Sequence, residues 1–303
     1  MHKSPRGNPA PFYMANKMMR SALKKYAPLF LLPTVAAFAI GFVWPFLWGI
    51  DLSFFSFTTL RFRKFVGFSN YIRVFTDPYY SGDFLHALGF TAVFALVSVI
   101  LINVLAFLIA YALTKNIRGS TVFRTVFFMP NLIGGIVLGY IWKIILNDVI
   151  RVLYHSQLVL ETKYGFWGLI ILMCWQQIGY MMIIYIAGLQ NIPTTYVEAA
   201  RIDGASSRQI LTKITIPCVM PSITICTFLS LTNAFKLYDQ NLALTGGDPA
   251  KTTQMLALNI TKAMYSNGAN KGIGQAEGVI FFLIVVTIAL IQLRMTRKGE
   301  SAL

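Results

Sequence analysis

Six long apolar stretches separate the polar parts of this sequence, and they decide what the chain can fold into. A transmembrane helix needs about 20 mostly apolar residues, and within lipid only helices and closed barrels satisfy every backbone hydrogen bond. The stretches are continuous and lack the alternation of a barrel strand, so we expect helices. The predicted fold class is an all-α polytopic membrane protein with six transmembrane helices. They cover about residues 27–50, 85–113, 123–146, 166–187, 216–238 and 277–293.

The composition fits a membrane protein and argues against a nucleic-acid-binding one. Of the 303 residues, 56% are hydrophobic and only 12% are charged, whereas a typical soluble domain has about 25% charged residues. The net charge of +15 can indicate nucleic acid. However, cytoplasmic loops and tails of membrane proteins also collect Lys and Arg, and no recognised nucleic-acid motif is present. We therefore expect this chain to bind membrane lipid and no nucleic acid.

The distribution of Lys and Arg predicts which side of the membrane each loop faces. An even number of spans puts both termini on one side, and Lys and Arg are enriched on the cytoplasmic side. The side of the termini holds 15 of the 26 Lys and Arg residues, whereas Arg61, Arg63 and Lys64 lie on the other side. We therefore predict that both termini are cytoplasmic. The segments on their side are the basic tail 1–25, the turn 114–124, the polar loop 188–215 and the end of the chain from Arg294.

The first apolar stretch has a second interpretation, a cleaved signal peptide. A signal peptide has an apolar core of about 7–15 residues and small residues at its cleavage site. The stretch here is longer, and Trp44, Pro45 and Trp48 stand where small residues would be needed. We therefore expect a retained helix and one transmembrane domain over 26–297, followed by a cytoplasmic tail over 298–303.

The polar loop before the fifth span predicts two short helices joined at a glycine. Thr194 or Thr195 can cap the first helix by accepting from free backbone amides. Gly204 can end this helix, because glycine readily takes the left-handed conformation. Ser206 or Ser207 can then cap the second helix. The loop is therefore expected to be an ordered element and not a flexible linker.

An amphipathic helix lying on lipid headgroups is one explanation for the first of these helices. Surface-lying helices are usually rich in Lys and Arg. This helix is instead rich in alanine and carries mixed charge from Glu198, Arg201 and Asp203. Such a composition favours close approach of a protein partner.

The same residues form a composite motif with a known counterpart. Glu-Ala-Ala at 198–200 is followed by Asp-Gly-Ala at 203–205 and then by Ile214 and Pro217. These pieces, with their spacing from glutamate to glycine to proline, resemble the EAA loop of binding-protein-dependent ABC importer permeases.

The resemblance extends over about residues 26–297. The segment 124–130, followed by Trp142-Lys143, is similar to the third-span region of the sugar-importing branch of this family. The sequence Leu-Thr-Gly-Gly-Asp-Pro at 244–249 resembles the LTGGGP loop of the maltose-type F subunit, with Asp248 in place of the third glycine.

This resemblance implies a permease subunit of a bacterial ABC importer that carries an oligosaccharide across the plasma membrane. It implies four kinds of partner: a second permease subunit, two ATPase subunits, an extracytoplasmic sugar-binding protein and membrane lipid. The chain itself would bind no cofactor, since ATP and Mg belong to the partner ATPase. In the family the EAA loop docks in a cleft of the ATPase. The residues implied to make this contact are Glu198, Ala199, Ala200, Arg201, Asp203 and Gly204.

No ATPase motif occurs in this chain, so we expect it not to be an enzyme. A P-loop needs the pattern GxxxxGK[ST], because its glycines let backbone amides surround the phosphates. The nearest approach spans 246–252, where Ala250 stands in place of the glycine before Lys251. The histidines and cysteines form no HExxH or CxxC motif, and we expect the cysteines to be packing residues. These residues are His2, His86, His155, Cys174, Cys218 and Cys226.

Polar residues within the apolar stretches mark a candidate substrate path. An ionisable side chain at the centre of a transmembrane helix costs about 2.5–3.5 kcal/mol and is usually functional. Positions 233, 236 and 240 share one helical stripe, and Lys236 can pair with Asp239. Packing between helices and snorkelling of Lys236 toward the interface are the alternatives. The candidates are Trp175, Gln176, Gln177, Tyr180, Asn233, Lys236, Asp239 and Gln240, and the family resemblance also favours Trp175 and Tyr180.

Other functions remain open at this point. An importer of glycerol-phosphate or another small polyol would keep the fold, but an anionic cargo would require several cavity cations, and Lys236 is the one plausible candidate. A membrane-embedded enzyme would require paired acids, a Ser/Lys pair or metal ligands at matched depth, and none is evident. A non-transporting scaffold or receptor is the remaining class.

Overall fold

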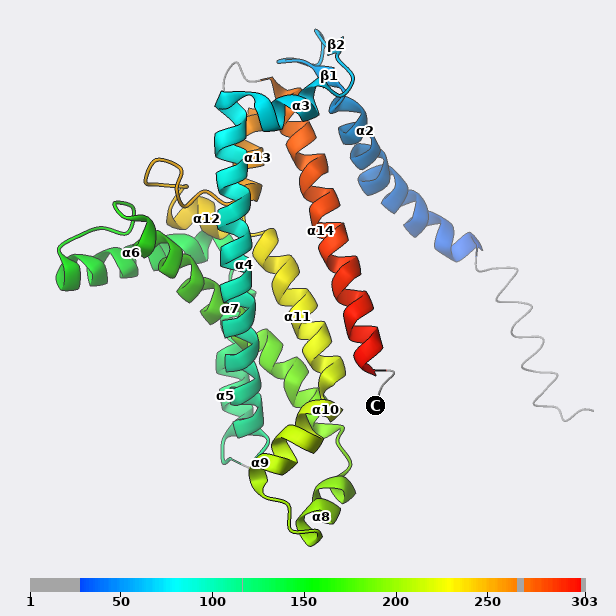
Figure 1. The fold of residues 1–303 in the computed structure, drawn as a ribbon, viewed down its shortest axis with the longest axis vertical. Coiled ribbons are helices and arrows are strands. Elements are labelled where there is room, and N and C mark those ends of the chain that lie inside the picture. Colours follow the sequence, from blue (N-terminus) through cyan, green and yellow to red (C-terminus); the bar gives the residue numbers. More distant parts are fainter. Residues whose placement is uncertain (1–27, 116, 266–269, 301–303) are drawn as a thin grey trace, which may run out of the picture. The chain divides into compact units, whose positions relative to one another are not determined.

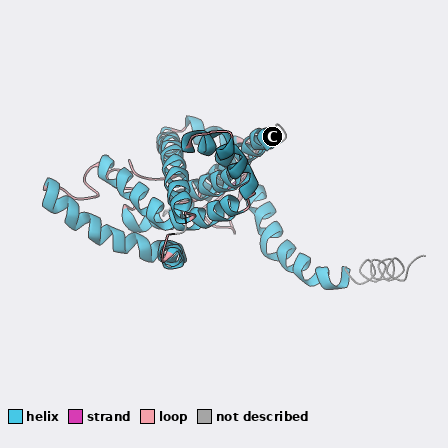
Figure 2. Cartoon of the chain, turned by 90° about the horizontal axis from the view of Figure 1, so that it is seen from below, coloured by secondary structure: helices cyan, strands magenta, loops and turns pink. Residues whose placement is uncertain are grey.

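Most of the described chain is helical (Figure 2). The structure, a computed structural model, describes residues 28–115, 117–265 and 270–300. The predicted basic tail over 1–25 and the last residues of the predicted tail over 298–303 lie outside these ranges.

The chain forms two units, and the first is Met1–Leu52. Within it, Pro28–Leu52 is an apolar helix of 25 residues, which is long enough to cross a hydrocarbon core of about 30 Å. A π-helical turn, η1 over Ala39–Val43, leads into α2 over Trp44–Leu52. Pro45 has no N–H to give to the preceding turn, which accounts for this irregularity.

Three long helices run through the second unit, Ser53–Leu303 (Figure 1). They are α4 over Pro78–Leu113, α7 over Thr162–Gln190 and α14 over Lys271–Glu300. The side chain of Asp77 caps α4 by accepting from the backbone N–H of Tyr79 at 3.1 Å, and a proline follows in the first turn, where no donor is needed. With 36 residues, α4 rises about 54 Å and therefore extends beyond the apolar layer.

The predicted third span, 123–146, is two helices in the structure and not one. A 3-10 turn, η2, separates α5 from α6, and the two helices are bent by 102°. Pro130 removes a backbone donor, and Gly134 adopts an extended conformation with ψ of 139°, so the helix cannot continue. These elements are α5 over Ser120–Phe128, η2 over Met129–Leu132 and α6 over Gly135–Tyr154.

A second bent pair stands in place of the predicted fifth span, 216–238. Here the helix axis turns by 66°, at Val219, where ψ is 8°. Within the described residues, four helices are long and apolar enough to cross a membrane, and up to six if each bent pair is one span. This range includes the predicted number. The pair consists of α9 over Ser207–Ile210, η3 over Leu211–Thr215, α10 over Ile216–Cys218 and α11 over Met220–Phe235.

Short elements join the long helices. One of them is a small antiparallel sheet, which pairs Phe55 with Phe65 and Ser56 with Lys64. The others are short helices. Their bounds are β1 over Phe55–Ser56, β2 over Lys64–Phe65, α3 over Ser69–Thr76, α8 over Thr194–Ile202, α12 over Asp239–Leu244 and α13 over Leu256–Tyr265.

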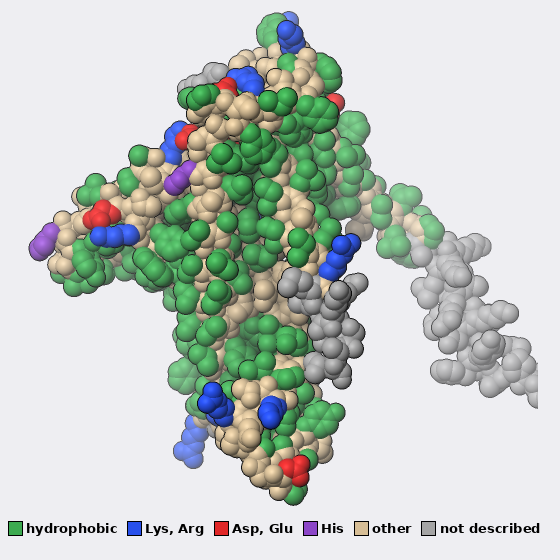
Figure 3. Space-filling view, in the orientation of Figure 1, with side chains coloured by type: hydrophobic (Ala, Val, Ile, Leu, Met, Phe, Trp, Pro, Cys, Tyr) green, Lys and Arg blue, Asp and Glu red, His purple; other side chains and the backbone are tan. Residues whose placement is uncertain are grey.

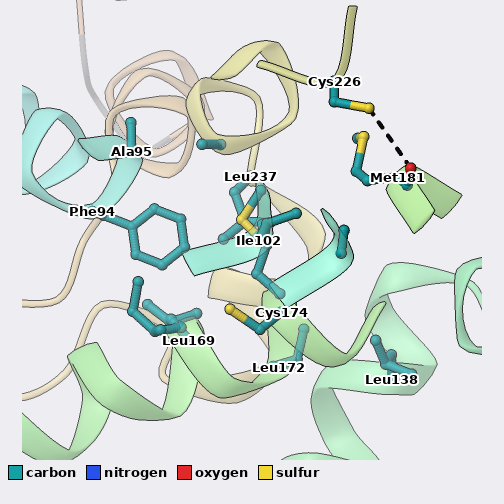
Figure 4. Close-up of a cluster of buried hydrophobic side chains, with 14 of the residues drawn as sticks. Phe94, Ala95, Ile102, Leu138, Leu169, Leu172, Cys174, Met181, Cys226 and Leu237 are labelled. Atoms are coloured by element: carbon teal, nitrogen blue, oxygen red, sulfur yellow. Dashed lines mark hydrogen bonds between the residues drawn. The ribbon is translucent and has the colours of Figure 1, made fainter. Parts of the chain in front are cut away.

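The core of the second unit lies where α4, α7 and α11 meet (Figure 4). Phe94 of α4 and Leu169 of α7 are fully buried there. Cys226 of α11 donates from its thiol to the carbonyl oxygen of Met181 at 3.7 Å. All three cysteines are free. Two are buried as expected, and the packing role predicted for Cys218 is wrong, because its side chain is exposed.

Apolar side chains cover the sides of the second unit (Figure 3). On α4, Val93, Leu96 and Ile100 are all more than half exposed. A soluble protein rarely exposes apolar surface of this extent. The long helices are therefore suited to lipid or to another membrane subunit.

Candidate coupling loop and polar path

A short helix, α8, follows α7 and carries the residues of the predicted EAA loop. Pro193 precedes its first turn with ψ of 128°, and no side chain caps this end. The sequence predicted Thr194 or Thr195 as the cap. That prediction is wrong, because α8 already begins at Thr194.

The end of α8 explains why glycine stands at position 204. Gly204 has a φ of +76°, in the left-handed region. Its N–H donates to the carbonyl of Arg201 at 3.1 Å, and the N–H of Ala205 donates to the carbonyl of Ala200 at 2.9 Å. These two bonds form a Schellman motif, which satisfies carbonyls that the last helical turn leaves free. Gly204 therefore ends the first helix, as predicted.

The second short helix, α9, begins within three residues of that glycine. Ser206 Oγ accepts from the N–H of Gln209 at 3.3 Å, and Gln209 Oε1 accepts from the N–H of Ser206 at 2.7 Å. This reciprocal pair is a capping box. Side chains and glycine within α8–α9 thus fix both helix ends locally, and no contact from a distant part of the chain is required.

None of the α8 side chains is buried. Glu198, Arg201 and Asp203 are exposed and form no salt bridge within the described residues. Ile202 is 87% exposed, and exposure of an apolar side chain to water does not stabilise the protein. The helix therefore offers unpaired charges and an apolar contact to a partner.

Two amide pairs join α7 to the residues around the end of α11. Gln240 Nε2, on α12, donates to Gln176 Oε1 at 2.8 Å. Asn233 Nδ2, on α11, donates to Gln177 Oε1 at 3.1 Å. Gln176 is only 6% exposed, and its amide donates in turn to the carbonyl of Ile133 at 3.3 Å, at the break before α6. The structure brings these four candidate path residues together.

The two candidate aromatic residues lie on the same helix, α7. The Trp175 ring meets the Trp142 ring edge-on at a centroid distance of 5.6 Å. The Tyr180 ring lies 6.5 Å from that of Phe128. Trp175 is 44% exposed, so part of its ring is free to contact a ligand. Aromatic faces near neutral amides suit a polyhydroxyl ligand better than an anion.

The predicted pair of Lys236 and Asp239 does not form in the described part of the chain. Both side chains are exposed. The helical stripe through 233, 236 and 240 is also wrong, because α11 ends at Phe235 and a separate helix begins at Asp239. Residues on either side of this break do not share one helical face.

Two glycines of α6 were not singled out in the sequence, and they determine how α6 packs on α12. A Cβ at Gly135 would lie 2.8 Å from the Cβ of Asp239, and one at Gly139 would lie 2.6 Å from the Cβ of Ala243. The signal was present, because two glycines four residues apart are typical of close helix packing in membranes.

A buried polar chain through Asn103 was also missed. Tyr185 Oη donates to Asn103 Oδ1 at 2.7 Å, and Asn103 Nδ2 donates to Ser230 Oγ at 2.9 Å. These bonds connect α4, α7 and α11. A lone asparagine within an apolar stretch was the available signal.

The LTGGD loop, residues 244–255, follows α12 and is held by a buried asparagine. Asn241 is fully buried. Its Nδ2 donates to the carbonyl of Thr253 at 2.8 Å and to Thr245 Oγ1 at 2.9 Å, and its Oδ1 accepts from the N–H of Met255 at 2.9 Å. One side chain therefore fixes both ends of the loop.

The glycines of the LTGGD loop occupy positions that favour glycine. Gly246 and Gly247 have φ values of +63° and +97°, where a Cβ is disfavoured. Asp248 is not among the described residues with positive φ. This explains how aspartate can stand where the family pattern has a third glycine.

A chain of hydrogen bonds ties the LTGGD loop to α13 and α14. Lys262 Nζ donates to the carbonyl of Gly246 at 2.7 Å and to Gln254 Oε1 at 3.0 Å. Gln254 Nε2 donates to Asn259 Oδ1 at 2.7 Å, and Asn259 Nδ2 donates to Glu277 Oε2 at 3.1 Å. Burial lowers the pKa of Lys262.

Family membership follows from a comparison with known sequences. Residues 115–298 match the model of the binding-protein-dependent transport system inner membrane component family, and this match covers more than half of the chain. The chain belongs to this family. The family forms the inner membrane component of transport systems, and the matched region of this permease includes the α8–α9 loop and the candidate path residues.

Curated relatives cover almost the whole permease. It is 39% identical over 279 residues to the probable starch degradation products transport system permease protein AmyD of Thermoanaerobacterium thermosulfurigenes, with 90% of this chain and 94% of AmyD covered. It is 30% identical over 285 residues to the sn-glycerol-3-phosphate transport system permease protein UgpA of Brucella abortus biovar 1, with 90% and 96% covered.

A solved structure shares the fold of the permease. A chain of the bacterial alginate ABC transporter, crystallised in complex with an alginate pentasaccharide-bound periplasmic protein, matches with a TM-score of 0.75 at 20% sequence identity. The match covers 92% of this chain and 97% of that one. The predicted polytopic helical membrane fold is therefore confirmed.

Proposed function

We propose that this permease is one membrane-spanning subunit of a bacterial ABC importer for an oligosaccharide, powered by ATP hydrolysis on a separate subunit. The observation that carries the proposal is the exposed and locally fixed α8–α9 loop, with the unpaired charges of Glu198, Arg201 and Asp203. The name of the relative AmyD, at 39% identity, supports a sugar of the starch-derived class.

The proposed arrangement places the α8–α9 loop and both termini in the cytoplasm of the bacterial plasma membrane. Two ATPase subunits bind ATP and Mg and dock at this loop, through Glu198, Ala199, Ala200, Arg201, Asp203 and Gly204. A second permease subunit completes the path through the membrane. A sugar-binding protein delivers the cargo from outside, as the periplasmic protein in the alginate complex suggests by analogy.

Transport in this arrangement is a rigid-body movement driven from α8. When the ATPases close on ATP, they push on α8–α9, and the connected helices α7 and α11 tip toward the outward-facing state. The neutral amides of Gln176, Gln177, Asn233 and Gln240, with the ring of Trp175, then offer hydrogen bonds and an apolar face to a sugar. Hydrolysis returns the helices to the inward-facing state.

Charge changes on α8 and at the glycine that follows it test the docking role. Glu198→Lys and Gly204→Asp are each expected to reduce uptake of radiolabelled maltotriose at least about tenfold, because reversing or adding a charge in a buried interface costs about 2 kcal/mol or more. Uptake is measured in cells that have no other route for the sugar, and immunoblots confirm equal membrane levels. Arg118→Glu, an exposed charge reversal in the turn after α4, is the control and should keep uptake.

Normal uptake in both the Glu198→Lys and the Gly204→Asp variant would contradict the docking role. A cysteine-accessibility probe that places Gly204 outside the cell would contradict the whole arrangement, since no ATPase could reach the loop there.

The second candidate cargo, sn-glycerol-3-phosphate, is favoured by the 30% identity to UgpA. An anion would require cations in the path, whereas the amide pairs are neutral and Lys236 is exposed at the end of α11. Competition between labelled maltotriose and labelled sn-glycerol-3-phosphate decides between the two. Uptake of neither would favour a scaffold that does not transport.

A further inference from the structure

A polar cavity of about 100 Å³ lies in the second unit, away from the residues of the candidate path. Its walls come from the first turns of α4, the LTGGD loop, α13 and the first turns of α14. The helix α13 lies between α4 and α14, near the end of the unit that is away from α8 (Figure 1). The cavity is therefore separate from both the α8–α9 loop and the amide pairs on α7.

Glu277 of α14 lines this cavity and is a buried carboxyl group without an ion pair. It is 1% exposed, and no cation reaches it at salt-bridge distance within the described residues. The amide of Asn259 donates to its Oε2 at 3.1 Å. A carboxylate can accept about four hydrogen bonds, and a buried one with few partners is costly. Its remaining acceptor sites suit the hydroxyl groups of a ligand.

Two buried amides hold the polar groups of the cavity in place. Gln254 and Asn259 are 1% and 4% exposed. Gln254 Nε2 donates to Asn259 Oδ1 at 2.7 Å, and Lys262 Nζ donates to Gln254 Oε1 at 3.0 Å. This chain has the carboxylate of Glu277 at one end and the ammonium of Lys262 at the other. Both ends are positioned in advance, and a preorganised site loses less entropy when it binds a ligand.

The charges that line the cavity balance, which selects against ions. Two carboxylates, Asp83 and Glu277, accompany two ammonium groups, Lys251 and Lys262, and Lys251 pairs with Asp83. An anion would meet the carboxylate of Glu277, and a cation would meet the ammonium of Lys262. A neutral polyol satisfies both, because each hydroxyl group can donate to a carboxylate and accept from an ammonium.

The rings and the size of the cavity fit part of one sugar. Tyr79 is 72% exposed, and its ring meets that of Tyr80 edge-on at a centroid distance of 4.9 Å. An aromatic ring offers an apolar face, which the C–H face of a pyranose can cover. The volume of about 100 Å³ corresponds to about three waters at about 30 Å³ each. The cavity can therefore take the hydroxyl edge of one sugar ring and not an oligosaccharide.

We propose that this cavity is a subsite for the terminal ring of a neutral sugar, which it holds before the sugar enters the path. Glu277 accepts from the hydroxyl groups of that ring, Lys262 donates to them, and Tyr79 covers the apolar face. This inference rests on the proposed function, which supplies the sugar and places the cavity on the exterior side. The LTGGD loop connects the subsite to the path, because it follows α12, which carries Gln240.

Hydrogen exchange on the complete transporter tests the subsite. The complex in phosphatidylcholine nanodiscs, without the binding protein, is titrated with maltotriose, and mass spectrometry follows the backbone amides of 79–83 and 251–263. The wild type should show protection of both segments at millimolar sugar. Glu277→Gln keeps the size of the side chain and should raise the half-maximal concentration at least about tenfold, because hydrogen bonds to an ionised acceptor are about twice as strong as neutral ones.

A second variant blocks the cavity by volume. Ala263→Phe puts a ring into the lining and should abolish the sugar-induced protection of both segments. Ala257→Phe makes the same change on the same helix, α13, outside the lining, and should leave the titration unchanged. Gln176→Ala removes an amide of the path and should also leave the protection in place. Unfolding temperatures are compared for every variant.

Two charged probes test the charge balance of the lining. Neither sn-glycerol-3-phosphate, an anion, nor putrescine, a cation, should protect the two segments at concentrations where maltotriose does. Protection by either probe equal to that by maltotriose would overturn the assignment to a neutral sugar.

The absence of protection in the wild type would overturn the subsite, and so would equal titrations for the wild type, Glu277→Gln and Ala263→Phe. The proposed function fails through a different result. Cells with the wild-type transporter would then take up no sugar, although maltotriose protected both segments.

Discussion

The α8–α9 loop and the LTGGD loop both contain glycines with positive φ. They differ in what stabilises them, because the first is held by bonds within itself and the second by bonds to surrounding helices. In α8–α9 the bonds join residues three to five apart, such as Ala205 with Ala200, and the side chains are largely exposed. The LTGGD loop is bound to α13 through Lys262, and the N–H of Leu256 at its end donates to Thr91 Oγ1 of α4 at 2.8 Å. The α8–α9 loop is therefore held by contacts within itself, whereas the LTGGD loop is held by contacts with the helix bundle.

The comparison shows that a loop can have a fixed backbone conformation and still leave its side chains exposed. A loop fixed by its own caps can keep every charged side chain free for a partner, which suits a contact that is made and broken in each cycle. A loop fixed by buried side chains moves only when the helices behind it move. The local loop should therefore tolerate changes without loss of the fold, and the LTGGD loop should not.

The largest effect is expected at Asn241. Asn241→Leu keeps the size of the side chain but leaves the carbonyl of Thr253 and the N–H of Met255 without their partners. Each buried polar group left unpaired costs about 1–3 kcal/mol, so the folded state should lose about 3 kcal/mol. Thermal unfolding of the detergent-solubilised protein, followed by size-exclusion chromatography, measures this loss.

The neighbouring residue Leu242 supplies the control for that prediction. Leu242 is on the same helix, α12, and is partly exposed, so Leu242→Ala should lower the unfolding temperature far less. Equal losses in the two variants would mean that the asparagine does not hold the LTGGD loop.

A smaller effect is expected at Lys262. Lys262→Met removes the bonds to Gly246 and Gln254, and hydrogen bonds to charged groups contribute about 1.5–3 kcal/mol each at most. Because the Lys262 side chain is only partly buried, the variant should lose about 1.5 kcal/mol of unfolding free energy. It is measured by the same unfolding assay.

The pH dependence of stability gives a second readout at Lys262. Burial lowers the pKa of Lys262 below its ordinary value of 10.5, so between the two pKa values the unfolded chain binds more protons than the folded one. Stability contributed by this group therefore rises with pH in the alkaline range below 10.5. Lys262→Met should lack that rise, and a rise that persists in the variant would have to come from another group.

The sequence was sufficient for the fold class and for part of the α8–α9 loop. Continuous apolar stretches allow only helices in lipid, and the glycine at 204 and the serine cap at 206 act over a few residues. The cap predicted at Thr194 or Thr195 was wrong, because α8 already begins at Thr194. The bend after α5 was not predicted, because proline and glycine are tolerated in membrane helices when neighbours satisfy the backbone. The close packing of Gly135 and Gly139 on α12 is one of the contacts that position α6, and it joins residues that are far apart in the sequence.

The candidate path could be predicted only in part. Residue types in apolar stretches pointed to Gln176 and Gln240, but 64 positions separate them, and nothing local pairs one with the other. The predicted pair of Lys236 and Asp239 assumed an unbroken helix. The structure ends α11 at Phe235, and an i,i+3 argument does not hold across such a break.

The smallest effect is expected at Gly204, where a substitution strains the backbone without causing a clash. A Cβ at this position has no neighbour within 4 Å, but φ is +76°. Left-handed backbone costs a non-glycine residue about 1–2 kcal/mol, and asparagine tolerates it better than alanine. Gly204→Ala should therefore speed hydrogen exchange at the backbone amides of residues 204 and 205 while leaving the global unfolding temperature unchanged. In Gly204→Asn, the same two amides should exchange at a rate between those of the alanine variant and the wild type. If both variants lowered the global unfolding temperature as much as Asn241→Leu does, α8–α9 would be part of the bundle after all, and the contrast between the two loops would fail.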